Sequence, residues 1–100
     1  MGNDNFIELA KTLIIQYYDE VRDITDSKDL NRQDIYVVWL SKVLQNNKAL
    51  LSTTLSDGMY YEVTYNGDKK EMYLDAYKKW QNKAVNVFGN VNEELIGDFI

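Results

Sequence analysis

Apolar residues recur at steps of three and four along the first quarter of the chain, with charged residues between them. The apolar positions are Phe6, Ala10, Leu13, Ile14, Tyr17, Val21 and Ile24. This spacing predicts an amphipathic helix from residue 5 to about residue 24. Asp4 or Asn5 is expected to cap it, because a short polar side chain can accept a hydrogen bond from a free backbone N–H of the first turn.

The pattern changes after a polar connection over residues 26–34, which has room for one helical turn. Residues 35–40 (IYVVWL) are apolar on both parities and rich in branched and aromatic side chains, which predicts a central strand covered on both faces. Residues 45–48 (QNNK) are typical of a hairpin turn, since Asn tolerates positive φ. Residues 49–55 would then form the returning strand.

A third strand is predicted by the alternation within residues 56–68 (SDGMYYEVTYNGD), which have turn residues at both ends. One side of this strand would carry Met59, Tyr61, Val63 and Tyr65, and the other would carry Tyr60, Glu62 and Thr64. A turn at Gly67-Asp68 would pair three residues of the apolar side with apolar residues that follow the turn. The expected pairs are Val63 with Met72, Tyr61 with Leu74, and Met59 with Ala76.

Residues 70–89 carry two overlapping patterns. Met72, Leu74 and Ala76 alternate like a fourth strand, whereas Tyr73, Ala76, Tyr77, Trp80, Ala84 and Phe88 fall at helical spacing. We expect a short strand near 71–75 that passes into a helix ending near Phe88, with one longer element of a single type as the alternative. Residues 90–100 are expected to dock loosely or to form a mobile tail. The prediction is one α+β domain over residues 1–100, with an N-terminal amphipathic helix, an antiparallel sheet of three to four strands and a C-terminal helix.

The residue types that are missing limit the chemistry. The chain has no Cys and no His, which excludes disulfides, thiolate nucleophiles, cysteine-rich zinc sites and histidine bases. Only carboxylates, Lys and Tyr remain as acids or bases, so we predict that the protein is not an enzyme and assign no catalytic residue, cofactor or metal. No apolar run approaches the roughly 20 residues that span a bilayer, and the N-terminus lacks signal-peptide features, so a cytoplasmic protein without a membrane role is expected.

Charge is concentrated in the first third of the chain. The net charge is −5, and residues 1–34 hold four basic and eight acidic residues. This excess argues against binding to nucleic-acid phosphates and leaves room for a basic protein partner. The acidic set is Asp19, Glu20, Asp23, Asp26 and Asp29, and its first four members form the candidate acidic surface. Its spacing does not match a calcium loop, and a solvated helix face is the plain alternative.

Tyrosine is abundant, with eight residues among 100, and two Trp join them. Core packing and cross-strand pairing explain most of them, because stacking on nucleobases would require a basic groove that the chain lacks. Tyr60 and Tyr73 fall on the strand parity directed away from the helix. If that face is uncovered, these two side chains would anchor a partner or a second subunit.

A resemblance rests on residues 36–39 (YVVW), 44–50 (LQNNKAL), 52–54 (STT) and above all 57–68 (DGMYYEVTYNGD). Across about residues 5–85 the chain resembles a family of small uncharacterised proteins, a domain of unknown function, encoded by phages and prophages of Gram-positive bacteria. The resemblance implies no catalytic residues. By analogy, small acidic phage proteins often bind a host protein, including defence effectors, in the host cytoplasm.

Three functions are therefore open. The leading hypothesis is a non-enzymatic phage or prophage accessory protein that binds a host or phage protein through the acidic region or an exposed sheet face. The second is a structural or assembly protein that self-associates as a homo-oligomer, and the third is a small enzyme that uses carboxylates.

Overall fold

The computed structural model describes residues 1–23, 25, 28–79 and 83–84. Helix α1 (Asn3–Val21) is followed by a short 3₁₀ turn, η1 (Arg32–Asp34). Four strands then follow in chain order: β1 (Ile35–Val43), β2 (Asn46–Thr53), β3 (Met59–Asn66) and β4 (Glu71–Lys78). The predicted α+β class, the N-terminal helix and the antiparallel sheet are confirmed. No helix among the described residues is long and apolar enough to cross a membrane.

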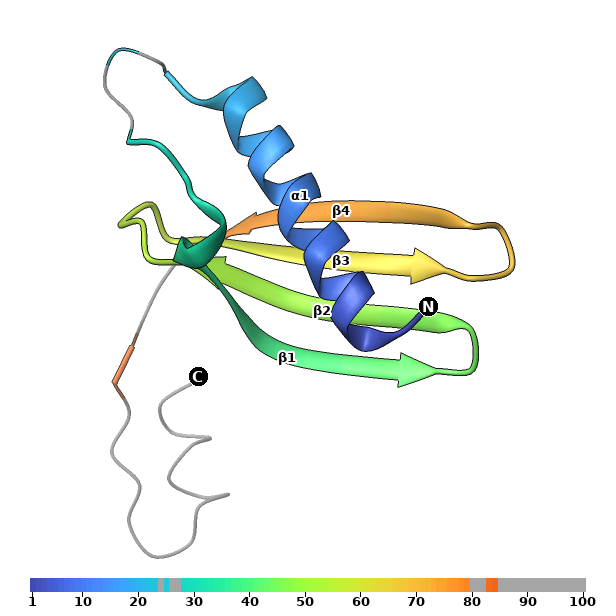
Figure 1. The fold of residues 1–100 in the computed structure, drawn as a ribbon. Helices are drawn as coiled ribbons and strands as arrows, with labels where there is room; N and C mark the ends of the chain where they lie inside the picture. The colour runs from blue at the N-terminus through green and yellow to red at the C-terminus, as the bar shows by residue number, and fades with distance from the viewer. Residues whose placement is uncertain (24, 26–27, 80–82, 85–100) are drawn as a thin grey trace, which may run out of the picture.

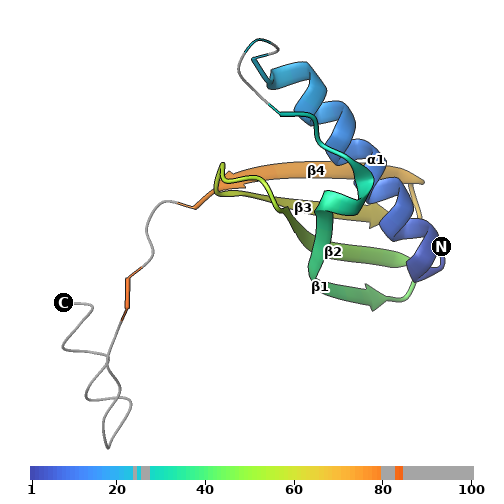
Figure 2. The ribbon, with the colours of Figure 1, turned by 60° about the vertical axis from the view of Figure 1, so that its left-hand side comes forward.

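The sheet is an antiparallel meander in the order β1-β2-β3-β4. Helix α1 crosses one face of the sheet diagonally, with its beginning over β2 (Figure 1). A second view shows the helix and the sheet as two layers, with the opposite face uncovered by any described element (Figure 2). We call this opposite face the open face.

The core lies between the helix and the sheet. Its fully buried side chains are Phe6, Ala10 and Ile14 from α1 and Ala49, Leu51, Tyr61 and Val63 from β2 and β3. The ring of Tyr17 meets that of Tyr61 edge to face, with 6.1 Å between their centroids. These residues follow the helical and strand periodicities of the sequence, so the predicted apolar face of β3 is confirmed, as is that of α1 from Phe6 to Tyr17. The helix ends at Val21 rather than near residue 24, Val21 is exposed in its last turn, and Ile24 lies outside the described residues.

The helix begins two residues earlier than expected, and its cap is not the predicted one. The N-cap is Gly2, which has no side chain that could cap the helix. Because the helix begins at Asn3, Asp4 and Asn5 lie inside it rather than before it. The early start is stabilised from outside the helix. The buried Asn47 donates from Nδ2 to the Met1 carbonyl oxygen at 3.3 Å and to Asn3 Oδ1 at 3.2 Å.

The connection contains the helical turn that the sequence allowed. Asn31 and Asp34 form a capping box around η1. Arg32 ties this turn to α1, because its guanidinium donates to the Glu8 carbonyl oxygen at 2.9 Å and to Thr12 Oγ1 at 2.7 Å. The same guanidinium forms an ion pair with the Glu8 carboxylate at 3.0 Å.

The prediction that residues 35–40 form a central, doubly covered strand is wrong. β1 is an edge strand that pairs with β2 alone, and only Ile35 in it is buried. Helix α1 packs on β2 and β3, which leaves β1 beyond its cover. A strand at the edge of a sheet can also carry apolar residues on both faces. The period of the apolar residues therefore does not distinguish an edge strand from a central strand.

The β1–β2 turn also differs from the prediction. It consists of Leu44 and Gln45, and β2 runs over Asn46–Thr53 rather than 49–55. Leu44 takes the positive φ, 56°, that was expected of an asparagine. The reason is burial: Asn47 lies fully buried against the start of α1, so it belongs to the strand and cannot serve in an exposed turn.

The β3–β4 register is shifted by two residues from the expected one. Val63 faces Leu74 rather than Met72, and Tyr61 faces Ala76. The turn has four residues, 67–70, because the Asn66 side chain accepts backbone hydrogen bonds from residues 68 and 69 and Lys70 adopts a φ of 54°. A shift of two keeps every side chain on its predicted face, since strand side chains alternate with a period of two.

β4 continues as a strand through Lys78. The predicted passage into a helix after residue 75 is therefore wrong for residues 76–78, where pairing with β3 extends to Met59. The rest of the predicted C-terminal helix, near residues 80–88, and the predicted tail over 90–100 fall largely or wholly outside the described residues.

Candidate functional site

The open face is lined by side chains that the sheet register places opposite the helix. Cross-strand partners share a face, so each row of the sheet can be followed across all four strands. The first row is Tyr36, Ser52, Tyr60 and Tyr77, the second is Trp39, Leu50, Glu62 and Asp75, and the third is Ser41, Lys48, Thr64 and Tyr73. Five of these twelve residues are aromatic.

A β-bulge brings Trp39 onto this face. The pairing of β1 with β2 skips one residue between Val37 and Trp39. Without the bulge, Trp39 would share the helix side with Ile35 and Val37. The extra residue reverses the alternation, so that Tyr36 and Trp39 point the same way although they are three positions apart. Their exposed fractions are 49% and 40%.

Both tyrosines predicted to face away from the helix do so. Tyr60 is half-buried beside Tyr77, and Tyr73 lies opposite Thr64 near the other end of β4. The Tyr73 hydroxyl donates to the Glu71 carboxylate, and this hydrogen bond raises the pKa of Tyr73 above its ordinary value. The bond keeps the phenol protonated and holds the exposed ring in place. Tyr73 therefore presents an exposed, hydrogen-bonded ring on the open face.

The charges of the open face are few and largely acidic. Lys48 forms an ion pair with Glu62 at 3.2 Å. Glu62 in turn faces Asp75 on β4. The single lysine among the three rows is therefore engaged, which makes the face a poor match for a nucleic-acid backbone.

A hollow of about 310 Å³ lies at the β1 side of the open face. It is lined by Trp39, Ser41, Val43, Lys48 and Thr64, together with Asn46 and Asn47. Trp39 and Val43 supply apolar walls, and the two hydroxyls supply donors and acceptors. Such a hollow is suited to receive an apolar side chain from a binding partner.

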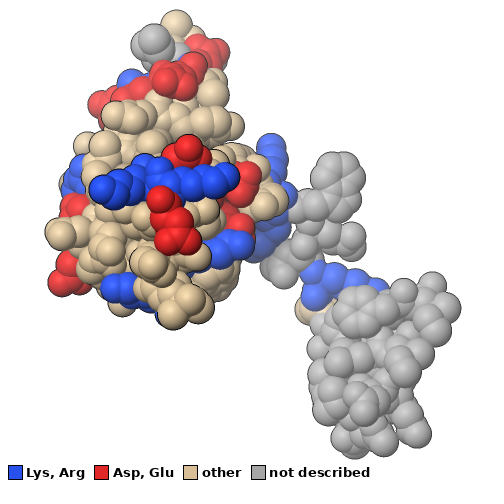
Figure 3. Space-filling model, turned by 90° about the vertical axis from the view of Figure 1, so that its right-hand side faces the viewer, with Lys and Arg blue, Asp and Glu red and all other residues tan. Residues whose placement is uncertain are grey.

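The predicted acidic surface is only partly assembled. Asp19 and Asp29 both contact Arg22, at 3.6 and 2.8 Å, and the bond to Asp29 raises the pKa of Arg22. Asp23 accepts two hydrogen bonds from Thr25, which lower its pKa. Figure 3 shows acidic side chains gathered near the end of the helix, with Lys and Arg interspersed on the same side of the molecule.

These carboxylates therefore help to organise the end of the helix. Glu20 remains exposed on α1. Asp26 lies outside the described residues. Within the described ranges no three carboxylates are grouped so that they could hold a metal ion.

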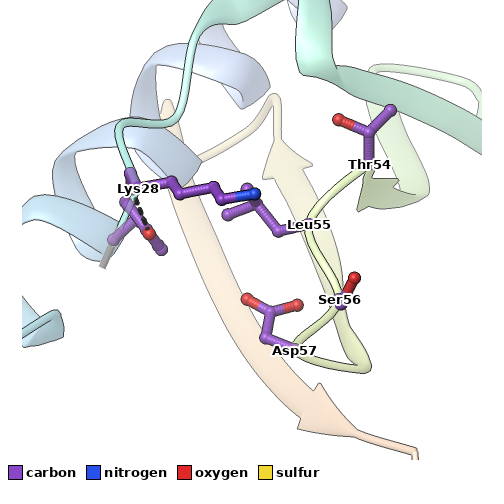
Figure 4. Close-up of a pocket in the computed structure, with 6 residues that line it drawn as sticks. Lys28, Thr54, Leu55, Ser56 and Asp57 are labelled. Carbon is purple, nitrogen blue, oxygen red and sulfur yellow. Dashed lines mark hydrogen bonds between the residues drawn. The ribbon is translucent and has the colours of Figure 1, made fainter. Parts of the chain in front are cut away.

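A second hollow, of about 290 Å³, lies beside the end of α1. It is lined by Tyr18, Lys28 and the β2–β3 connection over residues 54–57. The Lys28 side chain extends across it toward Leu55, while Asp57 projects from the turn below (Figure 4). Asp57 accepts the backbone N–H of Met59 at 3.1 Å, and the Tyr18 hydroxyl donates to the Lys28 carbonyl oxygen at 2.5 Å.

These groups act structurally. Asp57 closes a turn, Tyr18 joins α1 to the connection that follows it, and the chain has no histidine to activate Ser56 or Thr54.

A model of a family of unknown function (DUF6275) matches residues 7–87. The chain belongs to this family. The match begins within α1 and includes the whole sheet, so the open face and both hollows lie within the family domain. No curated protein and no solved structure matches the chain.

Sequence reasoning missed three aromatic residues of the open face: Tyr36, Trp39 and Tyr77. The first two were assigned to a buried central strand, and the third to a helix. A usable signal was present for Tyr77, since it continues the alternation of Tyr73 and Asp75. The position of Trp39 depends on the bulge, and no local residue preference predicts that bulge.

Proposed function

We propose that this member of the family is a non-enzymatic phage or prophage accessory protein that binds a host or phage protein through its open face. The observation that carries the proposal is the set of exposed aromatic side chains that β1 and β4 present on the open face. Tyr36, Trp39, Tyr73 and Tyr77 are each between 40% and 52% exposed.

Energetic reasoning favours a binding role for these residues. Aromatic side chains, above all Trp and Tyr, are enriched among the residues that dominate protein–protein binding energy. They contribute little to a core when they are this exposed, and each large apolar surface left in water forgoes hydrophobic stabilisation. The phage setting and the choice of a host protein, such as a defence effector, rest on the resemblance described above and on analogy.

The acidic region is the weaker candidate for the binding surface. Its described carboxylates at positions 19, 23 and 29 take part in local hydrogen bonds and ion pairs at the end of α1. A basic partner would compete with Arg22 and Thr25 for them. The open face has no such competing role for most of its aromatic side chains.

The test is a tagged pull-down from host lysate, with and without nuclease, analysed by mass spectrometry. The open-face variant is Tyr73→Ala with Tyr77→Ala. A matched control, Leu9→Ala with Val21→Ala, removes exposed apolar side chains from the helix instead. A stoichiometric partner that survives nuclease, is retained by the control and is lost by the open-face variant supports the proposal.

An acidic variant, Asp19→Asn with Glu20→Gln, separates the two candidate surfaces. Loss of the partner in this variant alone would move the binding surface to the end of the helix. If all bait proteins recover only themselves, the proposal of a heterologous partner fails.

Self-assembly is the second candidate function, and a specific observation favours it. β1 is an edge strand with apolar side chains on both faces. A protein that remains strictly monomeric at high concentration would eliminate this candidate.

A further inference from the structure

The exposed apolar surface of the described residues is concentrated on one strand. Seven of the twelve exposed large apolar side chains lie within nine positions on or beside β1. They are Tyr36, Val37, Val38, Trp39, Leu40, Val43 and Leu44. They lie on both faces of the strand, with Trp39 and Val43 on the open face and Val37 and Leu40 on the helix side. Large apolar side chains gathered at one sheet edge favour an interaction there.

The two edges of the sheet are protected to different degrees. β4 carries three charged residues, Glu71, Asp75 and Lys78, whereas β1 carries only Lys42. Charges on an edge strand discourage pairing with another chain. The bulge interrupts the first half of β1, but the segment from Trp39 to Val43 pairs with β2 without a shift. No described strand pairs with the outer side of that regular segment, so a further strand can be added there.

We propose that a second copy of this chain occupies the β1 edge. The two β1 strands pair antiparallel about a two-fold axis that passes between Ser41 and its counterpart. The two four-stranded sheets then form one continuous sheet. This inference concerns a closed dimer and does not depend on the heterologous partner proposed above.

The register follows from symmetry and from the faces of the side chains. With Ser41 on the axis, Trp39 lies opposite Val43 of the second copy, and Leu40 lies opposite Lys42 of the second copy. Both members of the first pair belong to the open face and both members of the second pair to the helix side, as cross-strand neighbours must.

Neighbouring registers fit less well. An axis at Val38 would set Val37 opposite Trp39, which point to different faces because of the bulge. An axis at Lys42 would place the two ammonium groups opposite each other, which is unfavourable. An axis at Leu40 would draw the bulge into the pairing and leave only three regular residues. Ser41 is the axis that uses the whole regular segment.

The hollow on the open face supports the same arrangement. Trp39, Ser41 and Val43 form its β1 wall. In the proposed pair, Val43 of the second copy covers Trp39, so the two hollows meet across the axis. Stable interfaces bury about 800 Å² on each partner, and the seven exposed side chains at this edge include Trp39 and Tyr36, of which 40% and 49% remain exposed in the single copy and available for burial.

Single-cysteine crosslinking tests the arrangement directly, because the chain has no Cys of its own. Directly opposed side chains in an antiparallel pair have Cβ atoms about 4.5–5.5 Å apart, close to the distance that a disulfide spans. We expect Ser41→Cys to form a disulfide-linked dimer under mild oxidation at least about tenfold faster than Asp75→Cys, its control on the β4 edge. Equal rates, or faster crosslinking through position 75, would overturn the proposal.

A charge pair at position 40 tests the register. Leu40→Lys and Leu40→Glu both remove the exposed leucine, but the first sets like charges opposite Lys42 of the second copy and the second sets opposite charges there. Sedimentation analysis should give a dimer dissociation constant about tenfold higher for Leu40→Lys than for Leu40→Glu, since each such contact occurs twice. Equal constants or the reverse order would refute the register, and a wild-type protein that is monomeric at millimolar concentration would refute the dimer.

The same variants distinguish this inference from the proposed function. If Leu40→Lys abolishes the dimer while the pull-down partner is retained, the two surfaces are independent. If the dimer forms and no partner is recovered, the dimer stands and the heterologous function fails.

Discussion

Gly67 in the β3–β4 turn packs directly against Gln45 in the β1–β2 turn. A Cβ atom at position 67 would lie 2.3 Å from the Gln45 carbonyl oxygen and 2.4 Å from its Cβ atom. The Gly67 N–H donates to Asn46 Oδ1 at 3.0 Å. The two hairpin turns are thus held together at one end of the sheet, and a glycine is required for this close approach.

Gly67→Ala is therefore expected to destabilise the fold by roughly 1–3 kcal/mol, the usual cost of forcing extra atoms into a closely packed site. Urea unfolding followed by circular dichroism measures the loss. Gly2→Ala is the control for added volume, because its Cβ meets nothing within 4 Å; as a change of the helix N-cap it should cost about 1 kcal/mol or less. Similar losses in the two variants would show that the turns separate easily.

Asn47 links the start of the helix to β2. Asn47→Ala removes a fully buried amide that donates to Met1 and Asn3, so we expect a loss of roughly 1–3 kcal/mol in the free energy of unfolding. A double-mutant cycle with Asn3→Ala should show a coupling of about 1 kcal/mol, since the two side chains share a hydrogen bond. Asn5→Ala, on the exposed side of the helix start, should show no coupling, and coupling equal to that of Asn3 would contradict the assignment.

The raised pKa of Tyr61 predicts a loss of stability at alkaline pH. Burial raises the pKa of Tyr61 to about 12, and the nearby Asp57 carboxylate adds to the shift. Below about pH 10, the ordinary pKa of tyrosine, the phenol is neutral in both states and its contribution is intact. Between about pH 10 and 12 only the unfolded chain releases the proton, so the free energy of unfolding falls, by up to about 2 kcal/mol for this group.

The measurement is a series of urea titrations between pH 8 and pH 12 on the wild type and on Tyr61→Phe. The variant cannot ionise at this position and should show the shallower decline. Identical slopes for the two proteins would mean that another group governs the alkaline transition.

Tyrosines on the two faces of β3 and β4 should differ in their effect on stability. Tyr61→Ala removes a side chain that is 1% exposed and should cost about 3–5 kcal/mol. Tyr77→Ala removes one that is 52% exposed and should change the free energy of unfolding by about 0.5 kcal/mol or less. Thermal or urea unfolding compares them, and a large loss for Tyr77→Ala would indicate that the open face is covered in solution.

Much of the architecture could be predicted from local patterns. The three- and four-residue steps around Phe6, Ala10 and Ile14 define a helix with one apolar face wherever the helix docks, and alternation around Tyr61 and Val63 defines a strand with one buried side. Tyr60 and Tyr73 could be assigned to the opposite face for the same reason. The face on which a side chain lies follows from the helical or strand period, and this period depends only on residues close together in the sequence.

Other features depended on which elements meet. The burial of Asn47 against the start of α1 moved the first turn to Leu44 and Gln45, and the reach of the helix left β1 as an uncovered edge. The bulge that turns Trp39 to the open face arises from pairing between strands. By itself the sequence determined that α1 is a helix and that β1, β2 and β3 are strands, and it determined the inward faces of α1 and β3, because short-range periodicity encodes them. Only the tertiary structure decided the edge, the register and the exposed aromatic surface, because these depend on contacts between residues distant in the chain.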